Sequence, residues 1–180
     1  MAGPADDFEL LRRYARARDE PAFAEVVREF PEARLALVGE GWLRPALEQQ
    51  AAGLGIAKHV MLLGKRTDVA DLMAACDAFV FPSLFEGLGV ALLEASYAGC
   101  ACIATDTGPI PEIITDGTTG LLVPAMDSAA LSRAMLAIAR DGSLAARLGA
   151  AASESARRRF RLSDKVTELE AFYSRLVATN

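Results

Sequence analysis

The chain alternates short apolar runs with longer segments in which apolar residues recur every three or four positions. Apolar runs of this kind are typical of strands buried on both faces of a sheet. The longer segments are typical of helices with one apolar side. The runs predict five strands, at residues 34–38, 59–63, 78–81, 100–105 and 120–123. Strands that alternate with helices indicate an α/β fold, with a Rossmann-like parallel sheet of about five strands and flanking helices.

The helical segments are bounded by residues that begin or end helices. Between the strands, the pattern predicts helices at residues 43–54, 69–76, 90–98 and 112–114. After Pro124 the chain is predicted to be helical to its end, with Asp127, Ser143 and Ser163 as expected N-caps. The spacing of apolar residues within 6–29 predicts two further short helices before the first strand.

Composition places the chain among globular proteins and excludes several kinds of partner. Apolar residues make up 52% of the 180 residues and charged ones 24%, enough for one domain with its own core. The net charge of −5 gives no general attraction to nucleic acid or anionic lipid. The N-terminus has no signal-peptide pattern, and no apolar run is long enough to cross a bilayer. We therefore expect a cytoplasmic protein; its few Lys and many Arg and Ala are typical of bacteria with GC-rich genomes.

The cysteines and the single histidine do not form a metal-binding pattern. The chain has three cysteines, which is an odd number: Cys76, Cys100 and Cys102. The last two lie at the start of a predicted strand. They are interpreted as buried thiols in a reducing compartment. His59 is distant from them in the sequence. We expect no metal and no cofactor.

The segment with the strongest chemical signal follows the third predicted strand. Pro82 ends strand pairing because it has no N–H, and a loop then carries Glu86. Gly87 and Gly89 lead into the predicted helix 90–98. Glycines at such a junction let a ligand approach the backbone, and the N–H groups of the first helical turn bind anions.

Two carboxylates lie on either side of this potential anion site. Glu86 and Glu94 are eight residues apart, or roughly 12 Å if most of the interval is helical. Two acids in this arrangement could hold hydroxyls at both ends of a diphosphate-linked ligand, such as a nucleotide-sugar. The alternative is an ordinary strand-to-helix junction with solvated acids.

The run FPSLFEGLGVALLEA, residues 81–95, resembles the Glu-x7-Glu signature of family 4 retaining glycosyltransferases (glycosyl transferases group 1). These enzymes have a two-domain GT-B fold and bind the nucleotide-sugar in the C-terminal domain. The resemblance runs from about Phe23 to the end of the chain. It implies that residues 31–180 form the nucleotide-sugar-binding domain, for glycosyl transfer with retention and without a bound metal.

The resemblance also implies roles for individual residues. Glu86 would hold hydroxyls of the transferred sugar at the catalytic centre, and Glu94 would bind the ribose hydroxyls. The diphosphate and the base would be bound mostly by backbone groups, at Gly87, Leu88, Gly89, Val90, Gly64 and Arg66. For the side chains of Lys65 and Arg66, a solvated basic turn is an equally weighted alternative.

The beginning of the chain departs from the family pattern. In family members this domain begins with a strand, a turn that contains Gly-Arg, and a helix with Lys-Gly at its start. The Arg and the Lys clamp the diphosphate. Here Arg16 and Arg18 are in about the right region, but on a predicted helix. The sheet is therefore expected to lack its first, central strand. We expect residues 35–38 to pair directly with residues 79–81 in a contracted sheet; a poorly folded chain or a strand borrowed from a partner is the alternative.

The N-terminal acceptor-binding domain of the family is also absent from these residues. In its place is a helical N-terminal segment, residues 1–30, part of which is weakly similar to the first helices of extracytoplasmic-function sigma factors. We expect a donor-binding domain that is inactive without a separate acceptor-binding domain. The alternatives are a non-catalytic nucleotide-sugar-binding module or a truncated remnant, and a docking helix for transcription machinery at residues 1–30.

Overall fold

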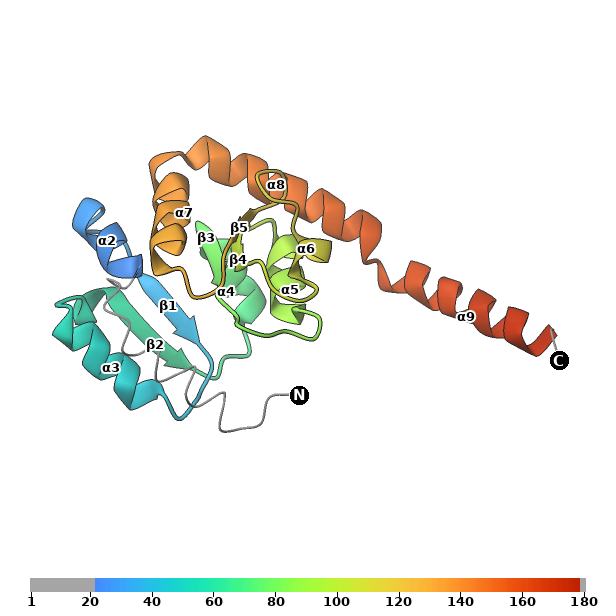
Figure 1. Ribbon diagram of the computed structural model, residues 1–180, viewed down its shortest axis with the longest axis horizontal. Coiled ribbons are helices and arrows are strands. Elements are labelled where there is room, and N and C mark those ends of the chain that lie inside the picture. Colours follow the sequence, from blue (N-terminus) through green and yellow to red (C-terminus); the bar gives the residue numbers. More distant parts are fainter. Residues whose placement is uncertain (1–21, 179–180) are drawn as a thin grey trace.

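The computed structural model describes residues 22–178, which form an α/β structure with five short strands (Figure 1). Each predicted strand is present, within one residue at either end. The strands are β1 (Leu35–Val38), β2 (Val60–Gly64), β3 (Ala78–Phe81), β4 (Ala101–Thr105) and β5 (Leu121–Val123). All three strand pairings are parallel. The predicted α/β class and the parallel pairing are confirmed.

Helices connect the strands and complete the chain. They are α2 (Ala22–Glu29), α3 (Arg44–Gly53), the 3-10 helix η1 (Ala57–His59), α4 (Val69–Ala75), α5 (Val90–Ala98), α6 (Ile110–Ile113), α7 (Ser128–Arg140), α8 (Gly142–Arg159) and α9 (Leu162–Ala178). The predicted helix that precedes α2, with Arg16 and Arg18, lies outside the described residues. The same holds for most of the segment that was expected from the sequence to resemble sigma factors.

One of the three expected N-caps is confirmed and two are wrong. Asp127 caps α7 by accepting a hydrogen bond from the N–H of Ala130 at 2.7 Å. Helix α8 is capped by Asp141, because its Oδ1 accepts from the N–H of Ser143 and that of Leu144, at 2.9 and 3.1 Å. Ser163 lies inside α9, which begins one residue earlier.

The sheet of β3, β4 and β5 is covered by helices on both faces. On one face, Leu92 of α5 and Ile110 of α6 are completely buried, and on the other Leu148 of α8 is completely buried against Ile103 of β4. Every residue of β4 is buried, as expected for the middle strand of a covered parallel sheet. The cysteines only partly meet expectation: Cys100 and Cys102 are buried, but Cys76 is exposed.

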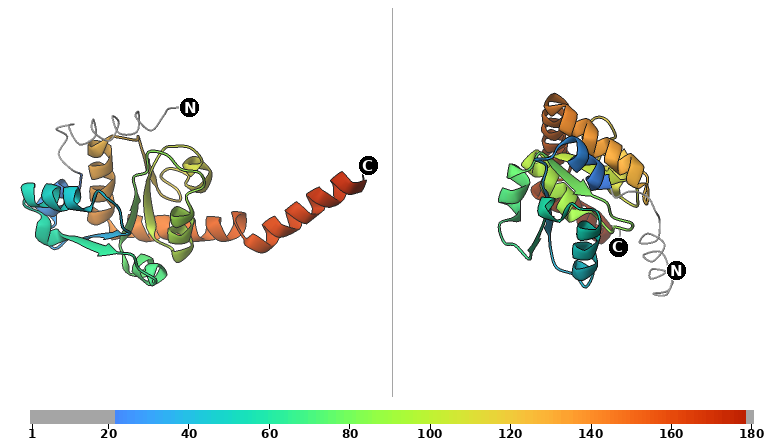
Figure 2. Two further views of the ribbon diagram at one scale, coloured as in Figure 1. Left: turned by 90° about the horizontal axis from the view of Figure 1, so that it is seen from below. Right: turned by 90° about the vertical axis from the view of Figure 1, so that its left-hand side faces the viewer.

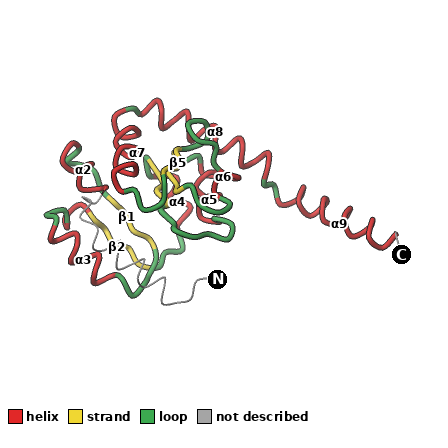
Figure 3. Tube along the Cα trace, viewed as in Figure 1, coloured by secondary structure: helices red, strands yellow, loops and turns green. Residues whose placement is uncertain are grey.

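The strands form two sheets, and the contracted five-stranded sheet expected from the sequence is wrong. Strand β1 pairs with β2, with Leu35 opposite Val60 and Leu37 opposite Leu62, and β3 begins a separate sheet in the order β3-β4-β5. Within residues 22–178 no strand lies between β1 and β3, and Figure 3 shows the two groups of strands apart. The edges of β1 and β3 that would face a central strand are therefore unpaired in the described part.

Helix packing connects the two sheets in place of strand pairing. Helix α2, which precedes β1, packs against α7, which covers β4 and β5. Arg140 of α7 donates two hydrogen bonds to Glu29 of α2, at 2.6 and 2.5 Å, and Ser132 donates to Glu25. These contacts fix the position of β1 through α2, so β1 does not move across to pair with β3. The predicted domain boundary at residue 30 stays a prediction.

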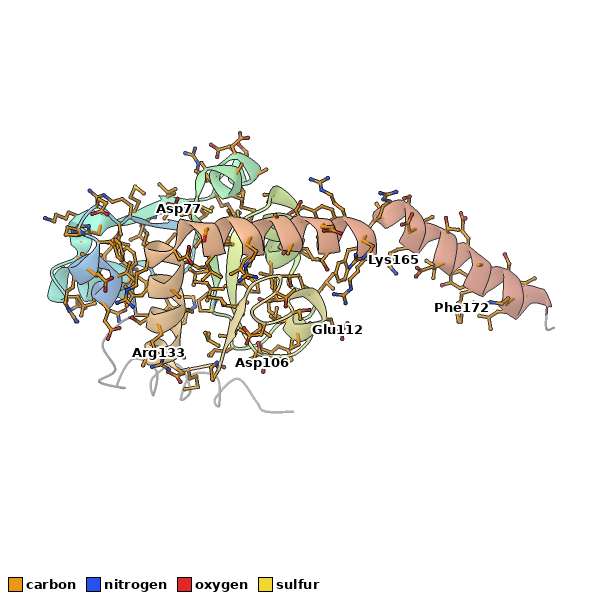
Figure 4. All side chains as sticks on the ribbon, turned by 90° about the horizontal axis from the view of Figure 1, so that it is seen from above. Asp77, Asp106, Glu112, Arg133, Lys165 and Phe172 are labelled. Carbon is orange, nitrogen blue, oxygen red and sulfur yellow. The ribbon has the colours of Figure 1, made fainter. Side chains whose placement is uncertain are left out.

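The C-terminal helix α9 extends away from the rest of the structure (Figure 2). Lys165 and Phe172 mark its course in Figure 4. Its large apolar side chains are exposed to solvent: Leu162, Val166, Leu169, Phe172, Tyr173, Leu176 and Val177. Across the described residues, no helix is both long enough and apolar enough to cross a membrane.

Candidate functional site at the end of β3 and the start of α5

The loop between β3 and α5 is anchored to the end of the neighbouring strand. After Pro82, the carbonyl oxygen of Ser83 accepts a hydrogen bond from the hydroxyl of Thr105, the last residue of β4. The hydroxyl of Thr107 approaches the same oxygen at 3.4 Å. The loop therefore begins from a fixed point at the C-terminal edge of the sheet, where parallel α/β sheets bind their ligands.

The carboxylate of Glu86 is oriented by this anchored loop. The hydroxyl of Ser83 donates to Oε1 of Glu86 at 2.7 Å, and Glu86 is half-buried. Its second oxygen, Oε2, has no hydrogen-bond partner among residues 22–178. The backbone is also held closely, because a Cβ built on Gly108 would lie 3.2 Å from the carbonyl oxygen of Glu86. The structure thus presents one carboxylate oxygen that is available to a hydroxyl donor.

Gly89 makes the turn from the loop into α5. Its φ of 76° lies in the left-handed region that favours glycine, and the residue is buried. A Cβ there would come within 3.0 Å of Cδ1 of Ile110. No side chain within the described structure caps α5, so the N–H groups of its first turn are available to an anion. Leu88 and Val90, on either side of Gly89, are exposed, as is Gly87.

Glu94 lies on the solvent side of α5, about one turn after the start of the helix. Leu92, Ala95 and Ser96 form the buried side of this helix, which leaves Glu94 exposed. Helix α5 begins only at Val90, so the helical rise between Val90 and Glu94 is about 6 Å. The loop before it sets the rest of the distance to Glu86, so the condition for a separation of roughly 12 Å, a mostly helical interval, is not met.

Gly64 and Arg66 lie at the end of β2, in the other sheet. The carbonyl oxygen of Gly64 accepts from the N–H of Gly39 at 2.8 Å, which joins the C-terminal ends of β1 and β2. The Arg66 guanidinium donates to both carboxylate oxygens of Asp68, at 2.8 and 2.5 Å. These hydrogen bonds hold the pKa of Asp68 below its usual value and raise that of Arg66. No hydrogen bond or ion pair in the described part connects Gly64 or Arg66 with residues 86–94.

Comparison with known proteins identifies the family from the larger part of the chain. Residues 21–141 match the family described as Glycosyl transferases group 1. The chain belongs to this family. This membership and the similarity to solved GT-B glycosyltransferases confirm that the fold is that of the C-terminal half of a GT-B glycosyltransferase.

Known proteins and solved structures resemble the chain over most of its length. It is 36% identical over 164 residues to N-acetyl-alpha-D-glucosaminyl L-malate synthase of Bacillus anthracis, covering 91% of the chain and 43% of the relative. Sucrose-phosphate synthase of Thermosynechococcus elongatus has a TM-score of 0.79 at 25% identity, with 88% of the chain and 42% of the neighbour covered.

A third similar protein, Alr3699/HepE of Anabaena, has a TM-score of 0.79 at 23% identity, covering 96% of the chain and 53% of that protein. Its crystal structure is described as a complex with UDP and glucose. The chain spans less than half the length of the Bacillus anthracis relative and about half of the Anabaena protein.

Sequence reasoning about this group 1 glycosyltransferase chain missed the residues that hold Glu86 in place. Ser83 and Thr105 were recognisable only as polar residues at strand ends, and Thr107 and Gly108 carried no signal of their own. The contacts among them depend on the β3–β4 register, with Phe81 opposite Ala104. That register is a tertiary feature, which the local pattern does not contain.

Proposed function

We propose that this chain is the donor-binding half of a family 4 retaining glycosyltransferase, and that it binds a nucleoside-diphosphate sugar along residues 86–94. The observation that supports this most is the junction itself. An oriented carboxylate, Glu86, precedes an uncapped helix start at Gly89, and an exposed carboxylate, Glu94, follows one turn later. The order and the chemistry of these groups suit a sugar, a diphosphate and a ribose in that order.

Each part of the donor has a proposed partner. The diphosphate lies at the N–H groups of Leu88, Gly89 and Val90, where the partial positive charge of the helix N-terminus favours an anion. Glu94 accepts hydrogen bonds from the ribose hydroxyls. Glu86 accepts from hydroxyls of the transferred sugar, with Ser83 holding its other oxygen.

The base is proposed to lie against the turn after β2. The Arg66 side chain is engaged by Asp68 and the Gly64 carbonyl by Gly39, so the exposed backbone of Lys65 and Arg66, next to Gly64, is the more available part of this turn. The nucleotide bound by the Anabaena protein, UDP, is the first candidate for the donor nucleotide.

The proposed chemistry is glycosyl transfer with retention at the anomeric carbon, without a bound metal. The bond between the anomeric carbon and the diphosphate oxygen breaks, and negative charge develops on the departing diphosphate. An acceptor hydroxyl forms the new bond to the anomeric carbon, and its proton passes to the departing diphosphate. N–H groups aimed at that charge lower the barrier because they are already oriented when the charge develops. Glu86 contributes by positioning the sugar.

Calorimetric titration against UDP, GDP, ADP and their sugars tests the binding proposal. We expect one nucleotide and its sugar to bind, and Glu94→Ala to weaken that binding by about 1–3 kcal/mol, the usual effect of removing a charged hydrogen-bond partner. Glu170, on α9, is also an exposed glutamate; Glu170→Ala is the matched control and should bind as the parent does. If Glu94→Ala and the parent bind a nucleotide equally, the site assignment is wrong.

A non-catalytic nucleotide-sugar-binding module is the second candidate function. It is favoured by the contacts of residues 81–94 in the described structure, which include no Lys or Arg side chain that could clamp a diphosphate. Holding the acceptor next to the donor can lower the activation barrier by about 7–11 kcal/mol. Without a domain that does this, we expect these 180 residues to show no transfer to a simple acceptor.

Donor turnover with and without an added acceptor-binding domain distinguishes the two candidates. Turnover that appears only with the added domain supports the donor-binding half of an enzyme. Binding without turnover in either case supports the non-catalytic module. Turnover by the chain alone would contradict the expected dependence on an acceptor-binding domain.

A further inference from the structure

Two cysteines lie together at the end of the β3–β5 sheet that is opposite the candidate donor site. Cys76 precedes β3 and Cys100 directly precedes β4, and the register of these strands places Ala78 opposite Ala101. Figure 4 shows Asp77, the neighbour of Cys76, and Asp106, which follows β4, at opposite ends of this layer. The two thiols therefore belong to the N-terminal edge of the sheet, and the mechanism proposed above does not use them.

The two sulfur atoms are brought together by one carbonyl group. The sulfur atoms of Cys76 and Cys100 both lie at hydrogen-bond distance from the carbonyl oxygen of Met73, in the last turn of α4, at 3.3 and 2.5 Å. The distance between the two Sγ atoms is 3.7 Å. To form a disulfide bond of about 2.05 Å, the two sulfurs must therefore approach by about 1.7 Å.

The two cysteines differ in exposure, as an attacking and a resolving thiol do. Cys76 is exposed to solvent, whereas Cys100 is 4% exposed and packs in the core beside Met73. The hydrogen bond from the Cys100 thiol lowers the pKa of Cys76 to about 7, which favours the thiolate form relative to an ordinary cysteine. The same contact, together with burial, raises the pKa of Cys100.

We propose that Cys76 and Cys100 are an oxidative modification site, at which a hydroperoxide converts the two thiols into an intramolecular disulfide. The Cys76 thiolate attacks one peroxide oxygen, the O–O bond breaks, and hydroxide leaves and becomes water by taking up a proton. The product at Cys76 is a sulfenic acid.

The second step uses the buried thiol. The sulfur of Cys100 attacks the sulfur of the sulfenic acid, the S–O bond breaks, and the oxygen leaves as water with the proton that Cys100 gives up. In total, two thiols and one hydrogen peroxide give one disulfide and two waters. Each cysteine loses one electron and the peroxide gains both.

The position of the disulfide connects this modification with the donor site. It would close a loop over residues 77–99, which contains all of β3, the loop that carries Glu86, and α5 with Glu94. Closing a loop of this length restricts the unfolded chain and thereby stabilises the folded state. Oxidation should therefore raise the thermal stability of the element that carries the candidate site.

Cys102 provides a matched control on the same strand. It is completely buried, two residues after Cys100, and burial raises its pKa to about 11. Its sulfur lies 3.8 Å from the hydroxyl of Ser96, and both its exposure and its pKa make it a poor target for a peroxide. We expect Cys102 to stay a thiol while the other two are oxidised.

The test uses the folded, fully reduced chain with hydrogen peroxide, followed by catalase, alkylation and mass spectrometry. The expected product is lighter than the reduced chain by two hydrogen atoms before alkylation, and carries one alkyl group, on Cys102. Peptide mapping should recover a Cys76–Cys100 linked pair that dithiothreitol separates. The melting temperature should be higher in the oxidised chain than in the reduced one.

Three variants decide the assignment. Cys102→Ser should keep the linked pair and the rise in melting temperature, and Cys76→Ser should lose both. Cys100→Ser should also lose them, but Cys76→Ser is the decisive variant because Cys76 is exposed and its replacement leaves the core unchanged. A parent chain that gives only sulfinic or sulfonic acid at Cys76, a link that includes Cys102, or only intermolecular disulfides would overturn the proposal.

Discussion

Gly149 of α8 lies directly on Gly99, the residue that ends α5. A Cβ built on Gly149 would be only 2.0 Å from the carbonyl oxygen of Gly99, a distance at which two atoms cannot coexist. Gly99 itself has a φ of 81°, in the left-handed region, and thereby turns the chain from α5 into β4. The close approach of two backbones at this point fixes α8 across the end of the helix that carries Glu94.

The first prediction follows from this contact. Alanine is a better helix former than glycine by about 1 kcal/mol, yet Gly149→Ala should destabilise the chain by about 1–3 kcal/mol because the added methyl group overpacks two backbones. Gly53→Ala, at the end of α3 with no atom near the new Cβ, is the control and should be neutral or slightly stabilising. Denaturant unfolding measures both. A Gly149→Ala variant as stable as the parent would show that α8 does not pack as described.

A second prediction concerns pH and the N-cap of α8. The hydroxyl of Ser143 and the N–H of Leu144 donate to Asp141 and lower its pKa. Because the folded-state pKa lies below the unfolded value of about 3.9, the cap stabilises the fold above that pH, and this stabilisation is lost as pH falls through the lowered pKa. Asp141→Ala should reduce the melting temperature at pH 7, and the difference from the parent should shrink at pH 2–3.

Ser143→Ala is the comparison for that experiment. It removes one hydroxyl donor but leaves both backbone hydrogen bonds to Asp141, so its effect at pH 7 should be the smaller one. A larger effect of Ser143→Ala than of Asp141→Ala would reassign the cap to Ser143.

The third prediction separates the two glutamates of the candidate site. Glu86→Ala should leave the affinity for the nucleoside diphosphate unchanged and remove the additional affinity that the sugar provides. Glu94→Ala should weaken both ligands by about 1–3 kcal/mol, because ribose is common to them. Titrations of each variant with the diphosphate and with its sugar give the comparison. Equal losses for the two ligands in Glu86→Ala would place Glu86 at the nucleotide instead.

A fourth prediction tests the division of the sheet by hydrogen exchange. Strand β4 is paired on both edges, whereas β1 and β3 are each paired on one edge within residues 22–178. Amides without a ladder partner exchange faster when water reaches them. Peptides covering β1 and β3 should therefore exchange faster than those covering β4. Protection of β1 equal to that of β4 would indicate that its second edge is covered in solution.

The strand positions were predictable because each short apolar run is bounded by glycine, proline or charged residues. Helix α5 was predicted without error, since Gly89 and Gly99 enclose an apolar segment of helical length. The pairing of the strands was not predictable. Whether β1 meets β3 depends on where α2 packs, and that is fixed by contacts with α7 that are more than a hundred residues away in the sequence.

In the candidate site, too, the contacts between distant parts of the sequence were not predictable. Glu86, Gly89 and Glu94 lie in one continuous segment, so their types and spacing could be recognised from the sequence. Their support could not, because Thr105 reaches Ser83 from another strand. The prediction of Ser143 as the N-cap of α8 was wrong for a local reason, because Asp141 and Ser143 are both good N-cap residues. In the structure the Asp141 carboxylate accepts from two N–H groups, and the Ser143 hydroxyl donates to that carboxylate.

Helix α9 also determines how the whole particle behaves in solution. Its 17 residues span about 25 Å, whereas a compact chain of this length has a radius of gyration of about 16 Å. A rod longer than that radius, attached at one end, makes rotational diffusion anisotropic. Small-angle scattering should accordingly give a radius of gyration above the compact value. The pair-distance distribution should decrease gradually towards its maximum distance.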